Sequence, residues 1–305
     1  MSDSKKCGFI ALLGAPNAGK STLMNNLVGN KVSIITPKVQ TTRTRISGIT
    51  NIDNTQLIFI DTPGIFKPQK TLDKAMVRAA WNSAEDVDFT CVLVDAKKGL
   101  TQEVEMILNG LAKYPSPKIL LINKIDIIKK DKLLELASRL HEKCDFEQSF
   151  MISAKKGDGV DDLKKFLVKN VKEGEWMYPE DQISDIPTRL FVAEITREKL
   201  MLKLGQELPY RTMVETESFE EKEPSKKNKN GEIKINQVIY VESENHKKIV
   251  VGKGGSTIKE IGEKSRKELE WLFEKKVHLF LFVKVQENWQ NMRDKYEAMG
   301  LEFPN

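Results

Sequence analysis

The stretch Gly14-Ala15-Pro16-Asn17-Ala18-Gly19-Lys20-Ser21 fits the pattern G-x-x-x-x-G-K-[ST] at every fixed position. The apolar run Gly8–Leu13 precedes it, and the amphipathic stretch Ser21–Val28 follows it. A strand, a glycine-containing loop and a helix in this order can bind phosphate, because glycines let backbone N–H groups surround the anion and the helix N-terminus adds its dipole. We expect Lys20 to reach the β- and γ-phosphates and the Ser21 hydroxyl to bind Mg²⁺. The predicted phosphate-binding residues are Gly14, Ala15, Pro16, Asn17, Ala18, Gly19, Lys20, Ser21 and Thr22.

A second polar element, Asp61-Thr62-Pro63-Gly64, follows the apolar run Gln56–Ile60. Asp61 therefore lies at the carboxyl end of a predicted strand, where ligands of parallel sheets gather. We expect its carboxylate to stabilise bound Mg²⁺ through the ligands of the ion, without direct coordination. We expect the Gly64 N–H to donate a hydrogen bond to the γ-phosphate. An ordinary turn is the alternative for this motif alone, but its position after the phosphate loop favours the nucleotide site.

The loop Gln40-Thr41-Thr42-Arg43 lies between these two elements. A threonine here can bind Mg²⁺ only while the γ-phosphate is present, which makes the loop a switch. Thr42 is our choice over Thr41 for this role, and backbone capping is the alternative. The predicted switch residues are Thr41, Thr42, Asp61, Thr62, Pro63, Gly64 and Ile65.

Ile65 and Phe66 stand where many switch proteins carry a water-positioning glutamine. An apolar side chain cannot orient a nucleophilic water, so we expect slow intrinsic hydrolysis that needs further help. Asn17 is a candidate ligand for a monovalent cation such as K⁺, which could supply that help. The alternative, that Asn17 only shapes the loop, stays open.

Two further motifs follow later strands and concern the base. In Asn123-Lys124-Ile125-Asp126, a carboxylate at Asp126 can accept two parallel hydrogen bonds from guanine, whereas adenine would leave it unpaired. Asn123 would meet N7 or brace the loop, and the Lys124 stem would lie over the base. Ser153-Ala154-Lys155 would offer a backbone N–H to guanine O6. The four motifs in this order indicate GTP rather than ATP, with guanine-binding residues Asn123, Lys124, Asp126, Ser153, Ala154 and Lys155.

Short apolar runs separated by amphipathic stretches fill the first 170 or so residues. This alternation predicts an α/β unit, a mostly parallel sheet with helices on both faces. The predicted strands are Gly8–Leu13, Gln56–Ile60, Thr90–Val94, Lys118–Ile122 and Phe150–Ile152.

The remainder predicts a smaller α+β unit. Helices are expected over Arg189–Gly205 and Lys259–Lys275, a hairpin over Tyr210–Glu217 and Ile233–Glu242, and a last strand over Val277–Val285. The polar tract Glu220–Gly231 suits a flexible hairpin tip, and Trp289–Met299 suits an amphipathic terminal helix.

A glycine-rich loop, Gly252-Lys253-Gly254-Gly255, lies between an apolar run and an amphipathic helix in this second unit. Its G-x-x-G spacing is that of KH domains, in which the loop clamps the backbone of single-stranded nucleic acid. Residues 246–267 carry seven basic and two acidic residues, although residues 175–305 are net acidic. A plain glycine turn is the alternative. The predicted RNA-binding residues are Lys247, Lys248, Gly252, Lys253, Gly254, Gly255 and Lys259.

Other conspicuous side chains are interpreted as structural or set limits on the class of protein. Trp271, Phe273, Phe280 and Phe282 are expected to pack in the core rather than stack on bases. The three histidines have no ligand spacing, and three cysteines without a C-x-x-C pair exclude a disulfide framework and indicate a reducing compartment. The net charge of +5 is compatible with a nucleic-acid partner, and no apolar run approaches the roughly 18 residues of a membrane span.

With GAPNAGKS, QTTR, DTPG, NKID, SAK and the GKGG loop in this order, the chain resembles the Era family of bacterial GTPases over essentially its whole length. Arg197-Glu-Lys-Leu200 and Glu207-Leu-Pro-Tyr210 are similar to the family pattern at the start of its KH domain. The resemblance implies a P-loop GTPase domain over residues 1–174, a linker over 175–187 and a type II KH domain over 188–305. It implies a GTP-hydrolysing, Mg²⁺-dependent factor in small ribosomal subunit maturation that binds small-subunit ribosomal RNA near its 3′ end.

The resemblance also implies a cytoplasmic protein with some peripheral association with the inner membrane, and we expect a monomer. The alternative function is a GTPase of another process, such as tRNA modification, whose C-terminal domain binds a different partner. A scaffold on a membrane surface, held there by a basic face, is a third hypothesis.

Overall fold

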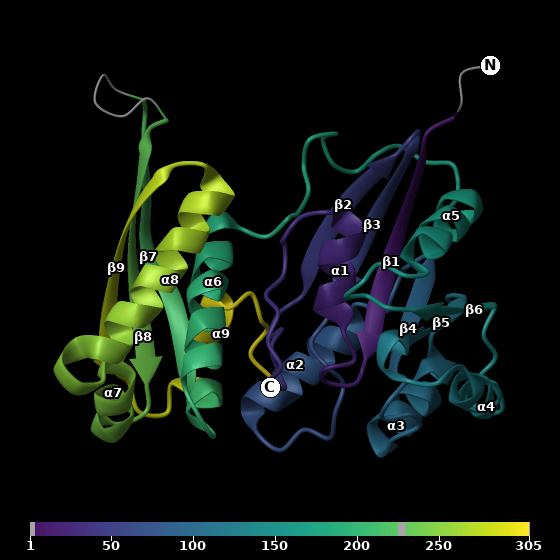
Figure 1. Ribbon diagram of the computed structural model, residues 1–305, viewed down its shortest axis with the longest axis horizontal. Helices are drawn as coiled ribbons and strands as arrows, with labels where there is room; N and C mark the ends of the chain where they lie inside the picture. The colour runs from purple at the N-terminus through teal and green to yellow at the C-terminus, as the bar shows by residue number, and fades with distance from the viewer. Residues whose placement is uncertain (1–3, 225–229, 305) are drawn as a thin grey trace. The chain divides into compact units, whose positions relative to one another are not determined.

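The computed structural model describes residues 4–224 and 230–304, which form two compact units (Figure 1). The first runs to Asp185, and the second runs from Ile186 to Phe303. Most of the predicted linker, residues 175–187, is bonded to the first unit. The Gln56 side chain accepts the backbone N–H groups of Met177 and Tyr178, and the Ile49 N–H donates to the Ile183 carbonyl.

The first unit is built on a six-stranded sheet of order β2-β3-β1-β4-β5-β6, parallel except for β2, which runs antiparallel to β3. The mostly parallel sheet was predicted and is confirmed. The edge strand β2 has no counterpart among the predicted runs, because Gly48, Thr50 and Asn51 interrupt its apolar residues. The strands are β1 Lys6–Gly14, β2 Ile46–Ile52, β3 Thr55–Asp61, β4 Phe89–Asp95, β5 Lys118–Asn123 and β6 Gln148–Ile152.

Helices cover both faces of this sheet. On one face, helices α1 and α5 bury Leu23 and Leu163 in the first core. On the other face, α2, α3 and α4 contribute buried apolar side chains to the second core. Neighbouring strand residues point to opposite faces, so Cys91 belongs to the first core and Val92 to the second. The helices are α1 Lys20–Val28, α2 Thr71–Asn82, α3 Gln102–Gly110, α4 Lys130–His141 and α5 Val160–Asn170.

The second unit is an α+β domain, as predicted. Its sheet has the order β7-β8-β9, with β7 antiparallel and β9 parallel to β8. Apolar residues of α6, α7 and α8 pack together with the sheet into one core, which includes Leu200, Ile239, Val250 and Ile261. The elements are α6 Thr188–Lys203, β7 Thr212–Lys222, β8 Glu232–Val241, α7 Glu244–Val251, α8 Ser256–Phe273 and β9 Lys276–Val285.

The chain's last segment and the hairpin tip differ from expectation. The predicted terminal helix over Trp289–Met299 is wrong in extent, since α9 spans only Arg293–Ala298 after a 3₁₀ turn. The cause is tertiary: Trp289 is buried and its indole N–H donates to the Arg211 carbonyl at 3.1 Å. In the predicted tip, β7 continues to Lys222, and residues 225–229 lie outside the described part.

The prediction of a core position is wrong for three aromatic residues. Trp271, Phe280 and Phe282 are 72%, 46% and 56% exposed. In β9 the reason is alternation: Leu281 lies against α8, so its neighbours in the strand point to the other face. Phe273, by contrast, packs against Phe219 with 5.9 Å between ring centroids.

Within residues 4–224 and 230–304, every helix is too short or too polar to cross a bilayer.

Candidate nucleotide and nucleic-acid sites

A pocket of about 340 Å³ opens at the carboxyl edge of the first unit's sheet, where β1, β3 and β5 end. It brings together the phosphate loop, the switch loop and the Asp61 segment, which are far apart in the sequence. Its lining residues are Pro16, Asn17, Gly19, Lys20, Ser21, Thr22, Ile34, Ile35, Thr36, Pro37, Gln40, Thr41, Thr42, Thr62, Gly64, Lys98 and Lys124.

The Lys20 ammonium is buried at the centre of the phosphate loop. It donates to the carbonyl oxygens of Gly14 at 3.1 Å and Ala15 at 3.3 Å. Burial lowers the pKa of Lys20 to about 8, against the opposing effect of the Asp61 charge. A phosphate arriving in the pocket would supply the negative charge that stabilises the protonated form.

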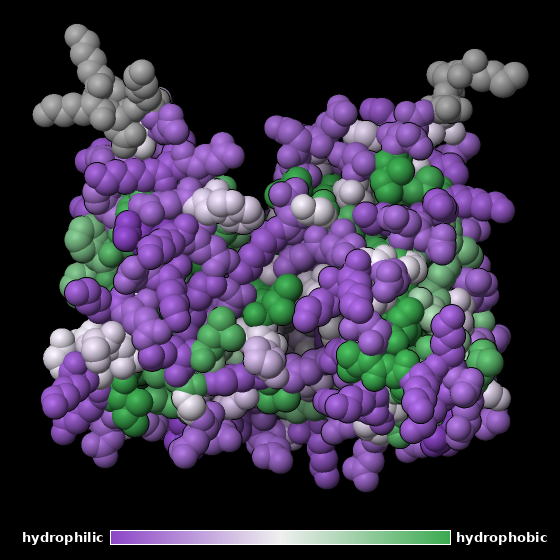
Figure 2. Space-filling model, in the orientation of Figure 1, coloured by the Kyte–Doolittle hydropathy of each residue, from purple (hydrophilic) through white to green (hydrophobic). Residues whose placement is uncertain are grey.

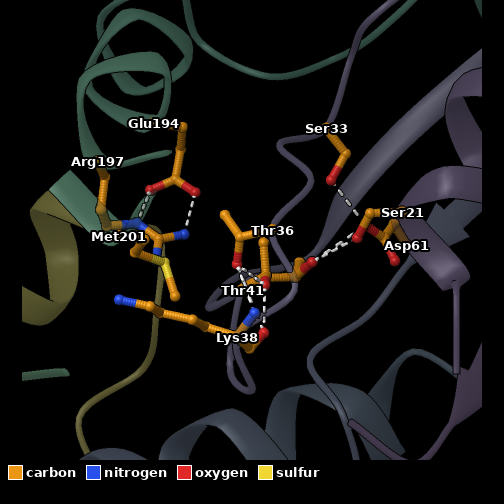
Figure 3. Close-up of polar contacts among 10 residues, drawn as sticks. Ser21, Ser33, Thr36, Lys38, Thr41, Asp61, Glu194, Arg197 and Met201 are labelled. Carbon is orange, nitrogen blue, oxygen red and sulfur yellow. Dashed lines mark hydrogen bonds and ion pairs between the residues drawn. The ribbon is translucent and has the colours of Figure 1, made fainter. Parts of the chain in front are cut away.

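Hydroxyl groups gather around Asp61 (Figure 3). The hydroxyl oxygens of Ser21 and Thr42 are 2.8 Å apart, and that of Thr42 donates to Asp61 Oδ2 at 3.3 Å. Ser33 also donates to Asp61 Oδ2, at 2.8 Å. Ser33 was not predicted, since it is a single residue outside any motif. Thr41 turns away and donates to the Lys38 carbonyl, so the structure places Thr42 rather than Thr41 beside Ser21.

This cluster fits a hydrated Mg²⁺ ion. Asp61 Oδ1 is buried and has no hydrogen-bond partner in the described chain, and burial raises the pKa of this carboxyl group. Hydroxyl, carboxylate and water oxygens are the ligands that Mg²⁺ prefers. Ser21 and Thr42 could coordinate the ion, and Asp61 could accept a hydrogen bond from one of its waters.

The Asp61-Gly64 segment approaches the phosphate loop closely. A Cβ atom on Gly64 would lie 2.9 Å from Pro16, so only glycine fits. The Thr62 hydroxyl donates to the Leu12 carbonyl at 2.8 Å, and the Ile65 N–H donates to the Gly14 carbonyl at 3.1 Å. Ile65 itself is fully buried, and its alkyl side chain can neither donate nor accept a hydrogen bond from water.

Asn17 both shapes the loop and keeps an unused oxygen. Its backbone is left-handed, with φ of 63°, and its side-chain amide donates to the Pro37 carbonyl at 2.9 Å. Its side-chain oxygen accepts no hydrogen bond from residues 4–224 or 230–304.

In the base-binding motifs, Asn123 acts as a brace. Its amide donates to the Ala18 carbonyl at 2.8 Å, and its oxygen accepts the N–H groups of Lys124 and Ala154. Both ends of the side chain are therefore committed within the protein. Of the two predicted roles for Asn123, this geometry favours bracing the loop.

Asp126 is free to meet a base, unlike Asn123. Its Oδ1 accepts a 2.8 Å hydrogen bond from the Ser153 hydroxyl, which lowers the pKa of the carboxyl group. Lys124 donates to the Asn17 carbonyl at 2.7 Å and pairs with Asp95 at 2.6 Å. Asp95 was not predicted, although its position at the end of β4 could have indicated it. Lys155 is exposed next to this loop.

The glycine loop of the second unit joins α7 to α8. Gly252 has φ of 75°, and a Cβ there would lie 2.3 Å from the Thr257 hydroxyl. Gly254 and Gly255 also have positive φ and open space around them, so backbone and solvent meet directly. The predicted lysines Lys247, Lys248, Lys253 and Lys259 lie on or beside this loop without ion pairs to described residues.

Each unit of the chain matches a known protein family. Residues 9–124 match the family described as "50S ribosome-binding GTPase", and residues 208–290 match the KH domain family. The chain is 52% identical to the GTPase Era of Afipia carboxidovorans over 98% of this chain and 95% of that protein. It is 54% identical to the GTPase Era of Agrobacterium fabrum over 98% and 92% of the two chains.

Two solved structures are similar to the whole chain. One is Era in complex with MgGDPNP and nucleotides 1506–1542 of 16S ribosomal RNA, with 41% identity and a TM-score of 0.90 over 97% of this chain and 99% of that one. The other is a variant of Aquifex aeolicus Era bound to GDP and AlF4⁻, with the same identity, TM-score and coverage.

Proposed function

Because the chain belongs to the Era family of GTPases, we propose that it couples a GTP switch to the binding of small-subunit ribosomal RNA during maturation of that subunit. Family membership makes it a GTP-hydrolysing enzyme with a P-loop GTPase unit and a KH unit. The observation that carries the proposal is that one chain holds both the guanine nucleotide pocket and a KH glycine loop with free lysines. For the domain limits we propose 1–174, 175–187 and 188–305.

In the first unit, Lys20 and the N–H groups of the phosphate loop would hold the β- and γ-phosphates. Ser21 and Thr42 would hold Mg²⁺, which draws charge from the phosphates as the γ-phosphoryl group is transferred to water. The Thr42 and Gly64 segments would be ordered only by the γ-phosphate, and its release would free both loops. That change is the signal we assign to the second unit.

Guanine recognition tests the nucleotide part of this function. Asp126 would accept hydrogen bonds from donor groups that guanine has and adenine lacks, so the affinity for GTP should be much higher than the affinity for ATP. Isothermal titration of the nucleotide-free protein with each nucleotide measures the difference. Equal affinities would contradict the role of Asp126.

Asn17 is our candidate ligand for K⁺, supported by its uncommitted side-chain oxygen beside the phosphate loop. Ile65 cannot orient water, so a cation near the phosphates would supply positive charge at the transition state. Hydrolysis should be faster in KCl than in NaCl, and Asn17→Ala should remove that difference while GTP still binds. Equal rates in both salts for the unaltered protein would exclude the cation role.

The RNA part rests on Lys253 and its neighbours. Lys253→Asp should weaken binding of an RNA with the sequence of nucleotides 1506–1542 of 16S ribosomal RNA and leave GTP binding unchanged. Lys267→Asp is the matched control, because Lys267 is an exposed lysine of the same unit that pairs with Glu263 at 2.7 Å. An equal loss in both variants would mean that only overall charge matters.

Crosslinking in cells followed by sequencing distinguishes this function from its alternative. Enrichment of small-subunit ribosomal RNA supports the proposal, whereas enrichment of tRNA, or of no RNA, supports a GTPase of another process. We also propose a cytoplasmic monomer that associates peripherally with the inner membrane. Sedimentation of the purified protein tests the monomer, and fractionation before and after nuclease treatment tests whether membrane association is independent of RNA.

A further inference from the structure

The face of the second unit's sheet that the helices leave uncovered carries two exposed aromatic rings. Leu281 packs against Gly262 of α8, and Phe280 and Phe282 alternate with it along β9. Figure 1 shows β9 beside α8. They are 46% and 56% exposed. In the space-filling view, paler green atoms lie at the outer edge of this unit, where β9 runs (Figure 2). The two rings are about 7 Å apart along the strand, so each is separately accessible.

Among residues 230–304, the C-terminal segment covers one end of this face. At that end Lys295 lies 3.9 Å from the centre of the Tyr240 ring and bonds to Glu215. Tyr240 is consequently buried, while the rings on β9 are not. Because β9 is an edge strand, a chain can pass around its free edge without displacing another strand.

The cations of the second unit fall into two groups. Most have a carboxylate within 4.0 Å, for example Lys199, Lys203 and Lys275. Among the described residues, the cations without such a partner form two clusters and one isolated site. They are Lys247, Lys248, Lys253 and Lys259 around the glycine loop; Lys234, Lys276 and Lys284 on the uncovered face; and Arg189 at the start of α6.

The register places these three lysines beside the rings. Lys276 and Lys284 point to the same side of β9 as Phe280 and Phe282, and Lys234 pairs with His278 on the neighbouring strand. We call Lys234, Lys276, Phe280, Phe282 and Lys284 the open face. The same face carries two carboxylates, Glu220 opposite Lys234 and Glu232 opposite Lys276, but neither is within 4.0 Å of these lysines. Aromatic rings between lysines can stack bases and hold phosphates, which is how single-stranded nucleic acid is bound. An acidic protein segment would also use these rings and lysines, so the choice of RNA rests on the length of RNA that the glycine loop leaves unbound.

We propose that the open face is a second RNA-binding surface, which stacks unpaired bases of the strand that the glycine loop clamps. The proposal rests on the proposed RNA binding. A G-x-x-G loop clamps about four nucleotides, whereas the RNA bound to a relative runs from nucleotide 1506 to 1542. The two surfaces lie on opposite sides of the same edge strand, since α7, which leads into the glycine loop, packs against the covered side of β9. An RNA leaving the clamp would reach the open face by passing around the free edge of β9.

The test compares a long and a short RNA on the full chain. The probes are an RNA with the sequence of nucleotides 1506–1542 and a tetranucleotide from its 3′ part, both fluorescently labelled. The double variant Phe280→Ser/Phe282→Ser should bind the long RNA about five- to tenfold more weakly, with an unchanged affinity for the tetranucleotide. Trp271→Ser is the matched control, because Trp271 is 72% exposed on α8, away from the open face.

A second double variant tests the proposal independently, in case the first one fails to fold. Lys276→Glu/Lys284→Glu changes only exposed charges and should weaken the long RNA and flatten its salt dependence. The proposal is overturned if the long RNA binds both double variants as tightly as the unaltered protein, or if Trp271→Ser weakens it equally. It is also overturned if the variants abolish self-association in sedimentation, or capture of a protein, without changing RNA affinity. Failure of the unaltered protein to bind either RNA would instead refute the proposed function.

Discussion

Replacing Asp126 by asparagine should invert the base preference of the nucleotide pocket. Asp126 accepts from Ser153 through Oδ1, and an asparagine oxygen can keep that hydrogen bond. The amide then presents N–H donors where guanine also presents donors. Two charge-assisted hydrogen bonds, each contributing about 1.5–3 kcal/mol, are lost or reversed. We expect GTP affinity to fall by about 10²–10⁴-fold.

The affinity for xanthosine triphosphate should rise in this variant as the affinity for GTP falls, because xanthine carries a carbonyl acceptor in place of the 2-amino group of guanine. Titration calorimetry with both nucleotides measures the exchange. Asp131→Asn is the control. Asp131 is exposed at the start of α4, and this substitution removes the same charge near the same loop. A GTP loss below tenfold, or no gain for xanthosine triphosphate, would refute the assignment of Asp126 to the base.

The Ser153 hydrogen bond also fixes the pH dependence of this recognition. It holds the pKa of Asp126 below its usual value, so the carboxylate stays ionised in any neutral assay. GTP affinity that depends on this group should be constant at neutral pH and fall only in acid, below the ordinary aspartate range.

Three further predictions concern other sites. The pKa of Lys20 is about 8 without nucleotide, and bound phosphate should raise it. Above about pH 8, GTP binding should therefore be accompanied by uptake of a proton. Calorimetry in buffers of different ionisation enthalpy measures this uptake, and release of a proton in that pH range would contradict the prediction. Ser33→Ala removes one donor to Asp61 and should raise the Mg²⁺ concentration for half-maximal hydrolysis about fivefold, and an unchanged Mg²⁺ titration would rule out this contribution. Arg197→Met breaks a buried pair with Glu194 and should destabilise the second unit by about 3–5 kcal/mol in scanning calorimetry, with GTP binding preserved; an unshifted transition would show that the pair contributes nothing.

The nucleotide site could be predicted because its chemistry is written in contiguous residues. A phosphate loop must be a glycine turn between a strand and a helix, so Gly14 to Ser21 defines strand, loop and helix together. Ser33 and Asp95 escaped prediction for the opposite reason. Each is a single residue whose partner, Asp61 or Lys124, is brought close only by the folded chain.

The aromatic residues of β9 show a different limit. In the run His278-Leu-Phe-Leu-Phe-Val283 almost every residue is apolar, so alternation says which side chains share a face and not which face is buried. The helices that cover Leu281 come from other parts of the chain. Local pattern therefore could not separate the core side of this strand from its exposed side.

Asn123 also shows how the recognition of the base depends on the phosphate loop. The sequence motif was compatible with two roles for Asn123, contact with guanine N7 or bracing of the loop. In the structure, both ends of its amide are hydrogen-bonded within the protein. One end holds the Ala18 carbonyl, and Lys124 holds the carbonyl of Asn17. The loop that carries Asp126 and the loop that carries Lys20 are thus one hydrogen-bonded unit. A base that fails to satisfy Asp126 disturbs the same network that positions the phosphates, so discrimination against ATP should extend to the phosphate end of the nucleotide.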